Sequence, residues 1–509
     1  MLPKKDKTMA ADLTSGSVPH FYRDIYDILC PDQQTQLDQD MFIKLLMKSS
    51  LPKETLTRIW ELVDCHHGYL TRSGVYKALA LIAVSQQGKP VNDVVLQNFG
   101  CQELPRPSLG DLSDLKALSV RLRREKNPTR LSMSYREVCS RDIIKVTLIP
   151  KKKGLILKHV EYEVSSQRFN SVVQRRYNDF VVLHEMLLHR FPYRMIPQLP
   201  PKKLVKTADA HFIEERRKAL KRFLTLVVRH PNISEDPLIH FFLTFLGRDV
   251  QHNLKEQFRS APDEFSTNRL AQTVEELDPL DTPTQSRLAR DLMKHVHSSV
   301  SKLRDAADSI KEQTLEGAVD MLTFGRELSW LADMANTDSE WSSGGNETWN
   351  HLKKGFKSLH PMFPPISNAL AEHSKQEDED VVEKLNLFLD LLSAYKELHD
   401  RYDNSINKMK RKSSSDLSAP QEGEQQERRK HFALHCISME TQLVHCYMNI
   451  VGEMLHSLIE LETIKHYKIY ELWKNMHPMV ENMNSADVVE ERLGSASPTG
   501  NKSPYFPSK

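Results

Sequence analysis

The residues that could do chemistry include one fragment of an enzyme motif. His351-Leu352-Lys353 matches the start of the phospholipase motif H-x-K-x-x-x-x-D, but Ser358 stands where the motif requires aspartate. The chain contains no G-x-G-x-x-G, Walker or G-x-S-x-G motif. With 17 glycines in 509 residues, it also lacks the glycine content typical of nucleotide-binding turns. We therefore predict no catalytic residue and no cofactor.

Neighbouring cysteines and histidines raise the question of a metal site. They occur at Cys65-His66-His67, His435-Cys436 and His445-Cys446. The last two pairs lie ten residues apart on one expected helix, and ten residues turn through about 1000°, so the pairs do not share a face. We therefore predict no zinc site. The absence of a C-x-x-C pair and of an apolar signal core at the N-terminus predicts a cytoplasmic protein.

Basic residues are concentrated in one segment. Between Arg141 and Arg229 the chain has 20 Lys and Arg residues against 8 Asp and Glu residues, a net charge of +12, although the whole chain carries +2. Such a segment predicts a cationic surface that binds anions. The basic residues are not interleaved with exposed aromatic residues as in proteins that bind single strands, and no zinc-finger or helix-turn-helix spacing is present. We therefore expect no nucleic-acid partner.

Residues 139–250, which contain this segment, are expected to form a small α+β domain. Ile144, Val146 and Leu148 alternate with other residues, and Tyr162 and Val164 repeat the two-residue period of a strand. A third strand is expected near residues 171–177, and helices are expected over 180–189, 212–230 and 237–246. Three strands followed by helices predict one sheet covered by helices.

Helical patterns flank this domain on both sides. Residues 18–95 contain short amphipathic helices, and residues 282–480 contain long ones. Apolar residues from Tyr447 to Leu461 alternate spacings of four and three, which is typical of a coiled coil. Long helices in a three-helix unit each bury one face, so we expect the C-terminal region to form a dimer.

The remaining segments are polar or of mixed composition. We predict linkers over 96–138 and 251–281, the second with a possible short amphipathic helix, and disorder over 1–17 and 481–509. The longest apolar runs fall far short of the ~20 residues that a membrane-spanning helix needs. Contact with membranes is therefore expected to be peripheral.

Three motifs in the basic segment resemble those of PX domains, the phosphoinositide-binding modules of sorting nexins. They are RRYNDF at 175–180, PQLPPK at 197–202 and FIEERR at 212–217. The resemblance implies that Arg176 holds the 3-phosphate of phosphatidylinositol 3-phosphate and that Tyr177 stacks beneath the inositol ring. It also implies that Lys202 reaches the 1-phosphate and that Arg216 pairs with the 4- and 5-hydroxyls. A guanidinium suits the first role because its N–H donors bind two phosphate oxygens at once.

Plainer interpretations of these residues stay open. Arg176 is alternatively a surface arginine beside a core tyrosine. For the lipid contact, Lys203 is the alternative to Lys202. For Arg216, the alternative is a salt bridge along its helix. Arg175, one residue earlier on a strand, should point to the opposite face and have a structural role. Nearby apolar residues are candidates for insertion into the bilayer or for the core: Phe191, Met195 and Ile196.

The N-terminal region resembles an EH domain, a pair of EF-hand-like units that binds Asn-Pro-Phe peptides. The match centres on Leu51–Leu62. It implies that Leu46, Leu56 and Trp60 form the pocket for the peptide phenylalanine, although residues of these types at helical spacing also form ordinary core. The loop Asp64–Gly68 offers one carboxylate, whereas calcium needs several oxygen ligands. We predict no calcium there.

The long C-terminal helices resemble a BAR domain, and the whole chain is similar to PX-BAR sorting nexins. The resemblance implies a peripheral membrane adaptor, not an enzyme, that binds phosphatidylinositol 3-phosphate on early endosomes. It further implies that a homodimer formed through the BAR helices senses or induces curvature in endosomal sorting and endosome-to-Golgi retrograde transport. The alternatives are an endocytic scaffold that recruits Asn-Pro-Phe-containing proteins and a lipid-modifying enzyme that carries a PX domain.

Overall fold

The computed structural model divides the chain into two compact units, Met1–Val138 and Cys139–Lys509. The residues it describes are 18–30, 37, 39–63, 70–92, 104–149, 160–202, 210–274, 281–333, 347–413 and 420–494. The expected disorder over 1–17, the loop considered for calcium and the alternative lipid contact Lys203 lie outside these ranges.

The first unit is built around a buried helix. Its helices are α1 (His20–Leu29), α2 (Gln39–Lys48), α3 (Lys53–Val63), α4 (Arg72–Gln86), α6 (Ser113–Lys126) and α7 (Tyr135–Cys139). Apolar residues cover every face of α4 from Val75 to Val84, and Thr71 caps its N-terminus by accepting a hydrogen bond from the Gly74 amide at 3.2 Å. The Tyr76 ring on α4 packs against Tyr22 and Tyr26 on α1. The core of this unit therefore surrounds α4.

The structure differs from the predicted linker over 96–138. Residues 113–126 form α6, and its buried Leu115 belongs to the same core as α1 and α4. Tyr22 donates a hydrogen bond to the Pro105 carbonyl at 2.7 Å, and Lys48 pairs with Asp114 at 2.8 Å. The mixed composition misled the prediction because α6 buries a narrow stripe at Leu115 and leaves Lys116 and Arg121 exposed.

The second unit begins with an antiparallel sheet. Its strands are β1 (Ile144–Leu148), β2 (Glu161–Ser166) and β3 (Ser171–Arg176), in the order β1-β2-β3. The register places Val146, Val164 and Val173 side by side on the buried face. The helices that follow are α8 (Tyr177–Arg190), α9 (Ala210–Arg229), η2 (Ile233–Glu235), α10 (Pro237–Thr244) and α11 (Val250–Phe258). The expected three-stranded α+β domain is confirmed.

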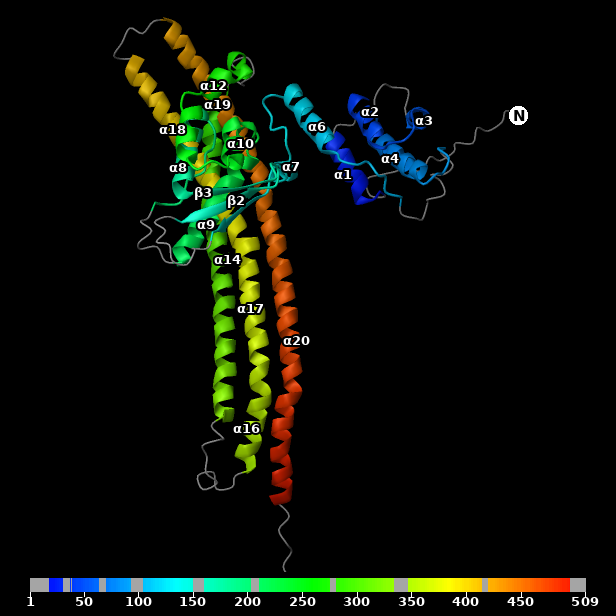
Figure 1. The fold of residues 1–509 in the computed structure, drawn as a ribbon, viewed down its shortest axis with the longest axis vertical. Coiled ribbons are helices and arrows are strands. Elements are labelled where there is room, and N and C mark those ends of the chain that lie inside the picture. The colour runs from blue at the N-terminus through cyan, green and yellow to red at the C-terminus, as the bar shows by residue number, and fades with distance from the viewer. Residues whose placement is uncertain are drawn as a thin grey trace, which may run out of the picture. The chain divides into compact units, whose positions relative to one another are not determined.

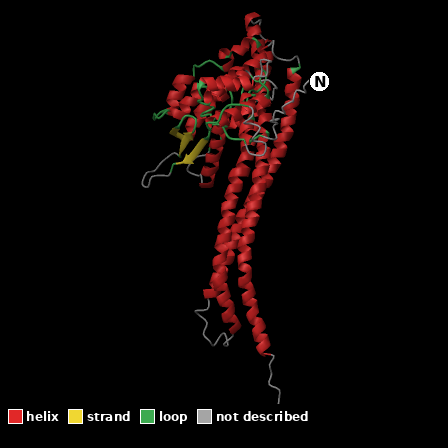
Figure 2. Ribbon diagram, turned by 90° about the vertical axis from the view of Figure 1, so that its right-hand side faces the viewer, coloured by secondary structure: helices red, strands yellow, loops and turns green. Residues whose placement is uncertain are grey.

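Three long helical stretches make up the rest of this unit. The first is α14 (Thr282–Asp333), and the second runs without a gap through α16 (Glu347–Leu359), η5 (His360–Met362), α17 (Phe363–Glu377), η6 (Asp378–Val382) and α18 (Glu383–Ser413). The third consists of α19 (Pro420–Tyr447) and α20 (Asn449–Gly494). Figure 1 shows α14, α17 and α20 side by side, and Figure 2 shows the sheet beside one end of these helices. The arrangement is the expected three-helix coiled coil.

Two further segments differ from the sequence predictions. The expected linker over 251–281 contains α11, α12 (Glu264–Thr267) and η3 (Arg269–Gln272), and the α11 residue Leu254 is buried in the core beneath the sheet. Val274 packs against Phe432 of α19, so this segment joins the sheet domain to the long helices. The expected disordered tail from residue 481 is helical as far as Gly494. Among the described residues, no helix is long and apolar enough to cross a membrane.

Candidate functional site

The two arginines at the end of β3 point to opposite faces of the sheet. Arg175 is 2% exposed, and its guanidinium donates hydrogen bonds to the carbonyls of Phe242 and Phe245 at 2.6–3.0 Å. Arg176 follows at the strand end, and its side chain is 56% exposed. Because alternate residues of a strand face opposite sides, burial of Arg175 in a structural role leaves Arg176 available to a ligand.

Arg176 is held from two sides. Its backbone N–H donates to the Asp179 carboxylate at 2.7 Å, which fixes the start of α8. Its guanidinium donates two hydrogen bonds, of 2.8 and 2.7 Å, to one oxygen of Glu161, the residue directly opposite on β2. Both residues line a hollow of about 750 Å³ that also includes Arg248. A carboxylate thus occupies guanidinium donors of Arg176.

Tyr177 and Arg216 lie against each other. The Arg216 guanidinium carbon sits 4.7 Å from the centroid of the Tyr177 ring and 4.5 Å from that of Phe212. Such cation–π contacts hold a guanidinium in one orientation. Arg216 is 4% exposed, and burial raises the pKa of Tyr177 although the nearby Arg216 opposes the rise. The aromatic sandwich therefore presents a fixed cation beside a tyrosine ring.

The proline-rich segment closes one side of this pair. The Tyr177 hydroxyl donates to the Pro200 carbonyl, and the Arg216 guanidinium donates to the Pro201 carbonyl at 3.4 Å. Lys202 follows directly and is exposed. The structure thus brings Tyr177, Arg216 and the start of the lysine loop together. Among the described residues, no hydrogen bond, ion pair or ring contact links the Arg176 side chain to Tyr177, Arg216 or Lys202.

The salt bridge along the helix that was considered for Arg216 is made by the next residue, Arg217. Arg217 donates two hydrogen bonds to a Glu214 oxygen one helical turn away, at 3.0 and 2.6 Å, and another to the Val146 carbonyl at 2.8 Å. Sequence analysis did not identify Glu161 or Phe212 as part of the site. Phe212 is four residues before Arg216, a spacing that predicts contact on a helix. The position of Glu161 depends on strand register, which the sequence does not reveal.

Of the two interpretations left open for the loop after α8, bilayer insertion or core, the structure shows burial. Phe191, Met195 and Ile196 are 4%, 2% and 0% exposed. Phe191 and Ile196 belong to the core of the sheet domain, and the Met195 amide donates to the Glu440 carboxylate on α19 at 3.3 Å. The loop is therefore covered by the long helices instead of being exposed to lipid.

Arg194 in the same loop is the centre of a buried ionic network. Its guanidinium donates two hydrogen bonds to Glu264, at 2.9 and 2.7 Å, and one to Glu440 at 3.1 Å. The His230 Nε2 atom lies 3.0 Å from both oxygens of Glu440. Burial opposes ionisation of Glu440, but His230 and Arg194 together hold its pKa below the usual range. This network fixes the sheet domain to α19.

In the first unit, the candidate peptide pocket is partly core. Leu46 is 4% exposed, whereas Leu56 and Trp60 are half-buried. The Trp60 ring lies 5.5 Å from the Phe42 ring, and the α2 side chain of Met47 is 70% exposed. The structure therefore buries one of the three candidates and leaves the other two partly accessible.

Comparison with known proteins agrees with this architecture. Family models of the PX domain and the EH domain match residues 163–246 and 19–99. Sorting nexin-8 from Bos taurus is 43% identical over 380 residues, covering 69% of this chain and 83% of the relative. Sorting nexin mvp1 from Aspergillus oryzae is 30% identical over 296 residues, covering 57% of this chain and 40% of the relative. A chain from the cryo-EM structure of the SNX-BAR Mvp1 tetramer matches with a TM-score of 0.51 and 20% identity, covering 66% of this chain and all of that chain.

The fold identifies the class of protein, and the sequence relatives identify the family. A PX-type sheet domain followed by three long helices is the PX-BAR architecture of proteins that act in membrane trafficking. The chain belongs to the sorting nexins, the adaptor proteins of endosomal sorting. Its first unit adds an EH domain to this architecture.

Proposed function

We propose that this protein is a peripheral adaptor that binds phosphatidylinositol 3-phosphate and acts in endosome-to-Golgi retrograde transport. The observation that carries the proposal is the sandwich of Arg216 between Tyr177 and Phe212, with Lys202 beginning the loop at its side. In this proposal Arg176 binds the 3-phosphate, Tyr177 stacks on the ring, Arg216 binds the hydroxyls and Lys202 binds the 1-phosphate. The early endosome, where this lipid is displayed, is the proposed location.

Co-sedimentation with vesicles tests the headgroup assignment. Vesicles with and without phosphatidylinositol 3-phosphate are compared at equal total negative charge. Arg176→Ala should lose the preference for the phosphoinositide, because a guanidinium that binds two phosphate oxygens is removed. Arg259→Ala removes the same charge from an exposed position near the end of α11 and should keep the preference. Wild-type selectivity in Arg176→Ala would place the headgroup elsewhere.

One further feature supports a homodimer that senses or induces curvature. Exposed apolar side chains lie one turn apart along two of the long helices: Leu315, Val319 and Leu322 on α14, and Leu455 and Ile459 on α20, each 42–66% exposed. Exposed apolar stripes of this kind mark an interface. Two headgroup sites on a rigid dimer would tighten membrane binding by about 10²-fold through avidity.

Sedimentation of one variant tests the dimer. Ile459 is 66% exposed, so Ile459→Glu should produce a folded monomer that keeps lipid selectivity but binds vesicles weakly. Lys468 lies nine residues away, on the opposite face of the same helix, and Lys468→Glu should leave the dimer intact. A wild-type chain that sediments as a monomer at micromolar concentration would exclude a dimer built on these helices.

The EH domain is proposed to recruit proteins that contain Asn-Pro-Phe. The support is the match to the EH family model and the partly accessible side chains of Trp60 and Leu56. Trp60→Ala in the full chain should abolish binding of an Asn-Pro-Phe peptide, measured by titration calorimetry. A wild-type chain that shows no heat of binding would contradict this assignment without affecting the lipid site.

A further inference from the structure

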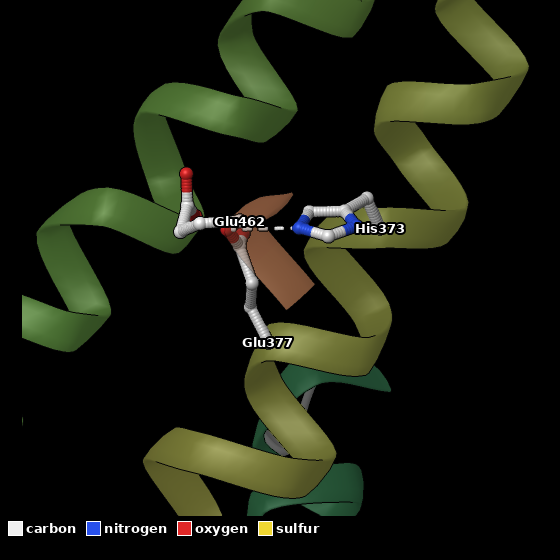
Figure 3. Close-up of side chains that lie close together, drawn as sticks. All are labelled: His373, Glu377 and Glu462. Atoms are coloured by element: carbon white, nitrogen blue, oxygen red, sulfur yellow. Dashed lines mark ion pairs between the residues drawn. The ribbon is translucent and has the colours of Figure 1, made fainter. Parts of the chain in front are cut away.

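A buried cluster in the middle of the long helices has no role in headgroup binding or in the exposed apolar surface. His373 and Glu377 lie one turn apart on α17, and Glu462 reaches toward them from α20 (Figure 3). The imidazole and the two carboxylates each offer one ligand atom within 4.8 Å of the others. His373 Nε2 and Glu377 Oε1 are 3.5 Å apart. Two helices therefore direct three possible metal ligands to one point.

Two buried atoms of this cluster have no hydrogen-bond partner. His373 is 5% exposed and Glu377 is 1% exposed, yet neither His373 Nε2 nor Glu377 Oε2 makes a hydrogen bond. Figure 3 shows the imidazole edge pointing toward the two carboxylates. Buried polar atoms are almost always satisfied, and exceptions call for an explanation such as a bound ion.

A lysine already occupies part of the site. The Lys465 ammonium lies 2.6 Å from Glu462 Oε1, 3.2 Å from Glu377 Oε1 and 3.3 Å from the Thr314 hydroxyl. One ammonium does not balance two carboxylates, and it makes no hydrogen bond to His373 Nε2 or Glu377 Oε2. Glu462 is 28% exposed, so the cluster opens to solvent on the α20 side. A lysine on a flexible stem can turn toward that solvent and admit an ion.

We propose that His373, Glu377 and Glu462 bind a zinc ion that links α17 to α20. One imidazole nitrogen and two carboxylate oxygens form a ligand set that zinc accepts, with water in the fourth position. Calcium and magnesium prefer sites made of oxygen alone, so the histidine selects a borderline transition metal. Zinc and Lys465 compete for the same carboxylates. The ion stabilises the helical bundle because its ligands come from two helices.

The experiment uses the full chain after treatment with a chelator and removal of the chelator. Titration calorimetry with Zn²⁺, and absorption spectroscopy with Co²⁺, should show one site per chain, and Zn²⁺ should raise Tm by several degrees. His373→Gln should weaken binding by at least 10-fold. Lys465→Met, which removes the competing ammonium and keeps the length of the side chain, should tighten binding by about 10-fold. His456→Gln, at an α20 histidine that is 83% exposed, should bind as the wild type does.

The Lys465→Met variant distinguishes this site from other histidines and cysteines. A zinc ion bound elsewhere in the chain would not respond to removal of that ammonium. Binding that is unchanged in both His373→Gln and Lys465→Met would overturn the proposal, and so would a wild-type chain without a Zn²⁺-dependent rise in Tm. Unfolding of His373→Gln would not obscure the result, because Lys465→Met and Co²⁺ absorption give independent answers.

Discussion

The PX domain uses arginine in two contrasting ways. Arg176 is 56% exposed and pairs with one oxygen of Glu161, whereas Arg194 is 4% exposed and is shared by Glu264 and Glu440. The first arginine can exchange its carboxylate for a phosphate at little cost, because the guanidinium remains hydrated. The second cannot, because its partners are buried with it. The solvent exposure of the pair, not the residue type, separates an arginine that a ligand can reach from a structural one.

The cations of the basic segment, residues 141–229, likewise differ in whether they are exposed or paired within the fold. Lys218 on α9 pairs with Asp378 of η6 at 2.7 Å, and Arg222 pairs with Glu383 and Asp390 of α18 at 2.9 and 2.7 Å. These acids lie in the long helices, outside the basic segment. Part of the excess positive charge therefore docks the sheet domain onto the bundle and does not face a membrane. The +12 charge overestimates the cationic surface that is available to anions.

Removing the buried arginine should have the largest effect on stability. Arg194→Met keeps most of the side-chain volume but leaves the carboxylates of Glu264 and Glu440 short of a cation. Breaking a buried pair by removing one partner costs about 3–5 kcal/mol. Thermal unfolding of the second unit should therefore begin at a much lower temperature. Arg176→Met is the matched control and should change stability by less than about 1 kcal/mol. Equal losses of stability in the two variants would show that the buried and the exposed arginine do not differ in their structural role.

The second-largest expected effect is a loss of stability at low pH, caused by a buried histidine. Burial lowers the pKa of His399, which is 3% exposed on α18, to about 4. Between pH 6.5 and 4 the unfolded chain binds a proton at this residue that the folded chain does not bind, so stability falls as pH falls through this range. The shift corresponds to about 3 kcal/mol. Unfolding in urea at pH 7, 6 and 5 should show the loss, and His399→Gln should flatten it; an unchanged pH dependence in His399→Gln would assign the loss to other groups.

The strands and long helices were predictable because their signals are local. Alternation at Ile144, Val146 and Leu148 and the heptad-like spacing from Tyr447 to Leu461 each indicate an element without reference to any other. The PX-like motifs also singled out Tyr177 and Arg216, which the structure places in contact. Local pattern therefore accounts for the elements, while the role of this pair in lipid binding stays a prediction.

The remaining features depend on contacts between segments far apart in sequence. Arg194 and Glu440 are 246 residues apart, and no local pattern indicates that they meet. The same holds for Glu161 opposite Arg176, which requires the register of β2 and β3. The linker over 251–281 was mispredicted for the same reason, because Val274 acquires its apolar partner Phe432 from α19. Composition alone cannot show which polar segments are covered by other parts of the fold.

A variant at the docking surface should have an intermediate effect. Arg222→Ala removes the cation shared by Glu383 and Asp390, and its side chain is 15% exposed. The expected cost is about 2 kcal/mol, less than at Arg194 because Asp390 keeps partial access to water. Hydrogen exchange should accelerate in α9 and in the adjoining part of α18, while the amides of β2 and β3 stay protected. Acceleration across the whole sheet would show that Arg222 supports the domain itself and not its docking.

The smallest expected effect is a gain in lipid affinity when the exposed Arg176–Glu161 pair is changed. In the proposed lipid site, the 3-phosphate must displace Glu161 from Arg176, so Glu161→Gln should tighten binding to vesicles containing phosphatidylinositol 3-phosphate by about 3-fold. The gain is small because the Arg176–Glu161 pair is partly solvated. Glu163→Gln is the matched control. It removes the same charge from the next outward-facing position of β2, opposite Gln174. If both variants tighten binding equally, the phosphoinositide responds to net charge alone and Glu161 does not compete with it; if Glu161→Gln alone gains affinity, the carboxylate and the phosphate share the donors of Arg176.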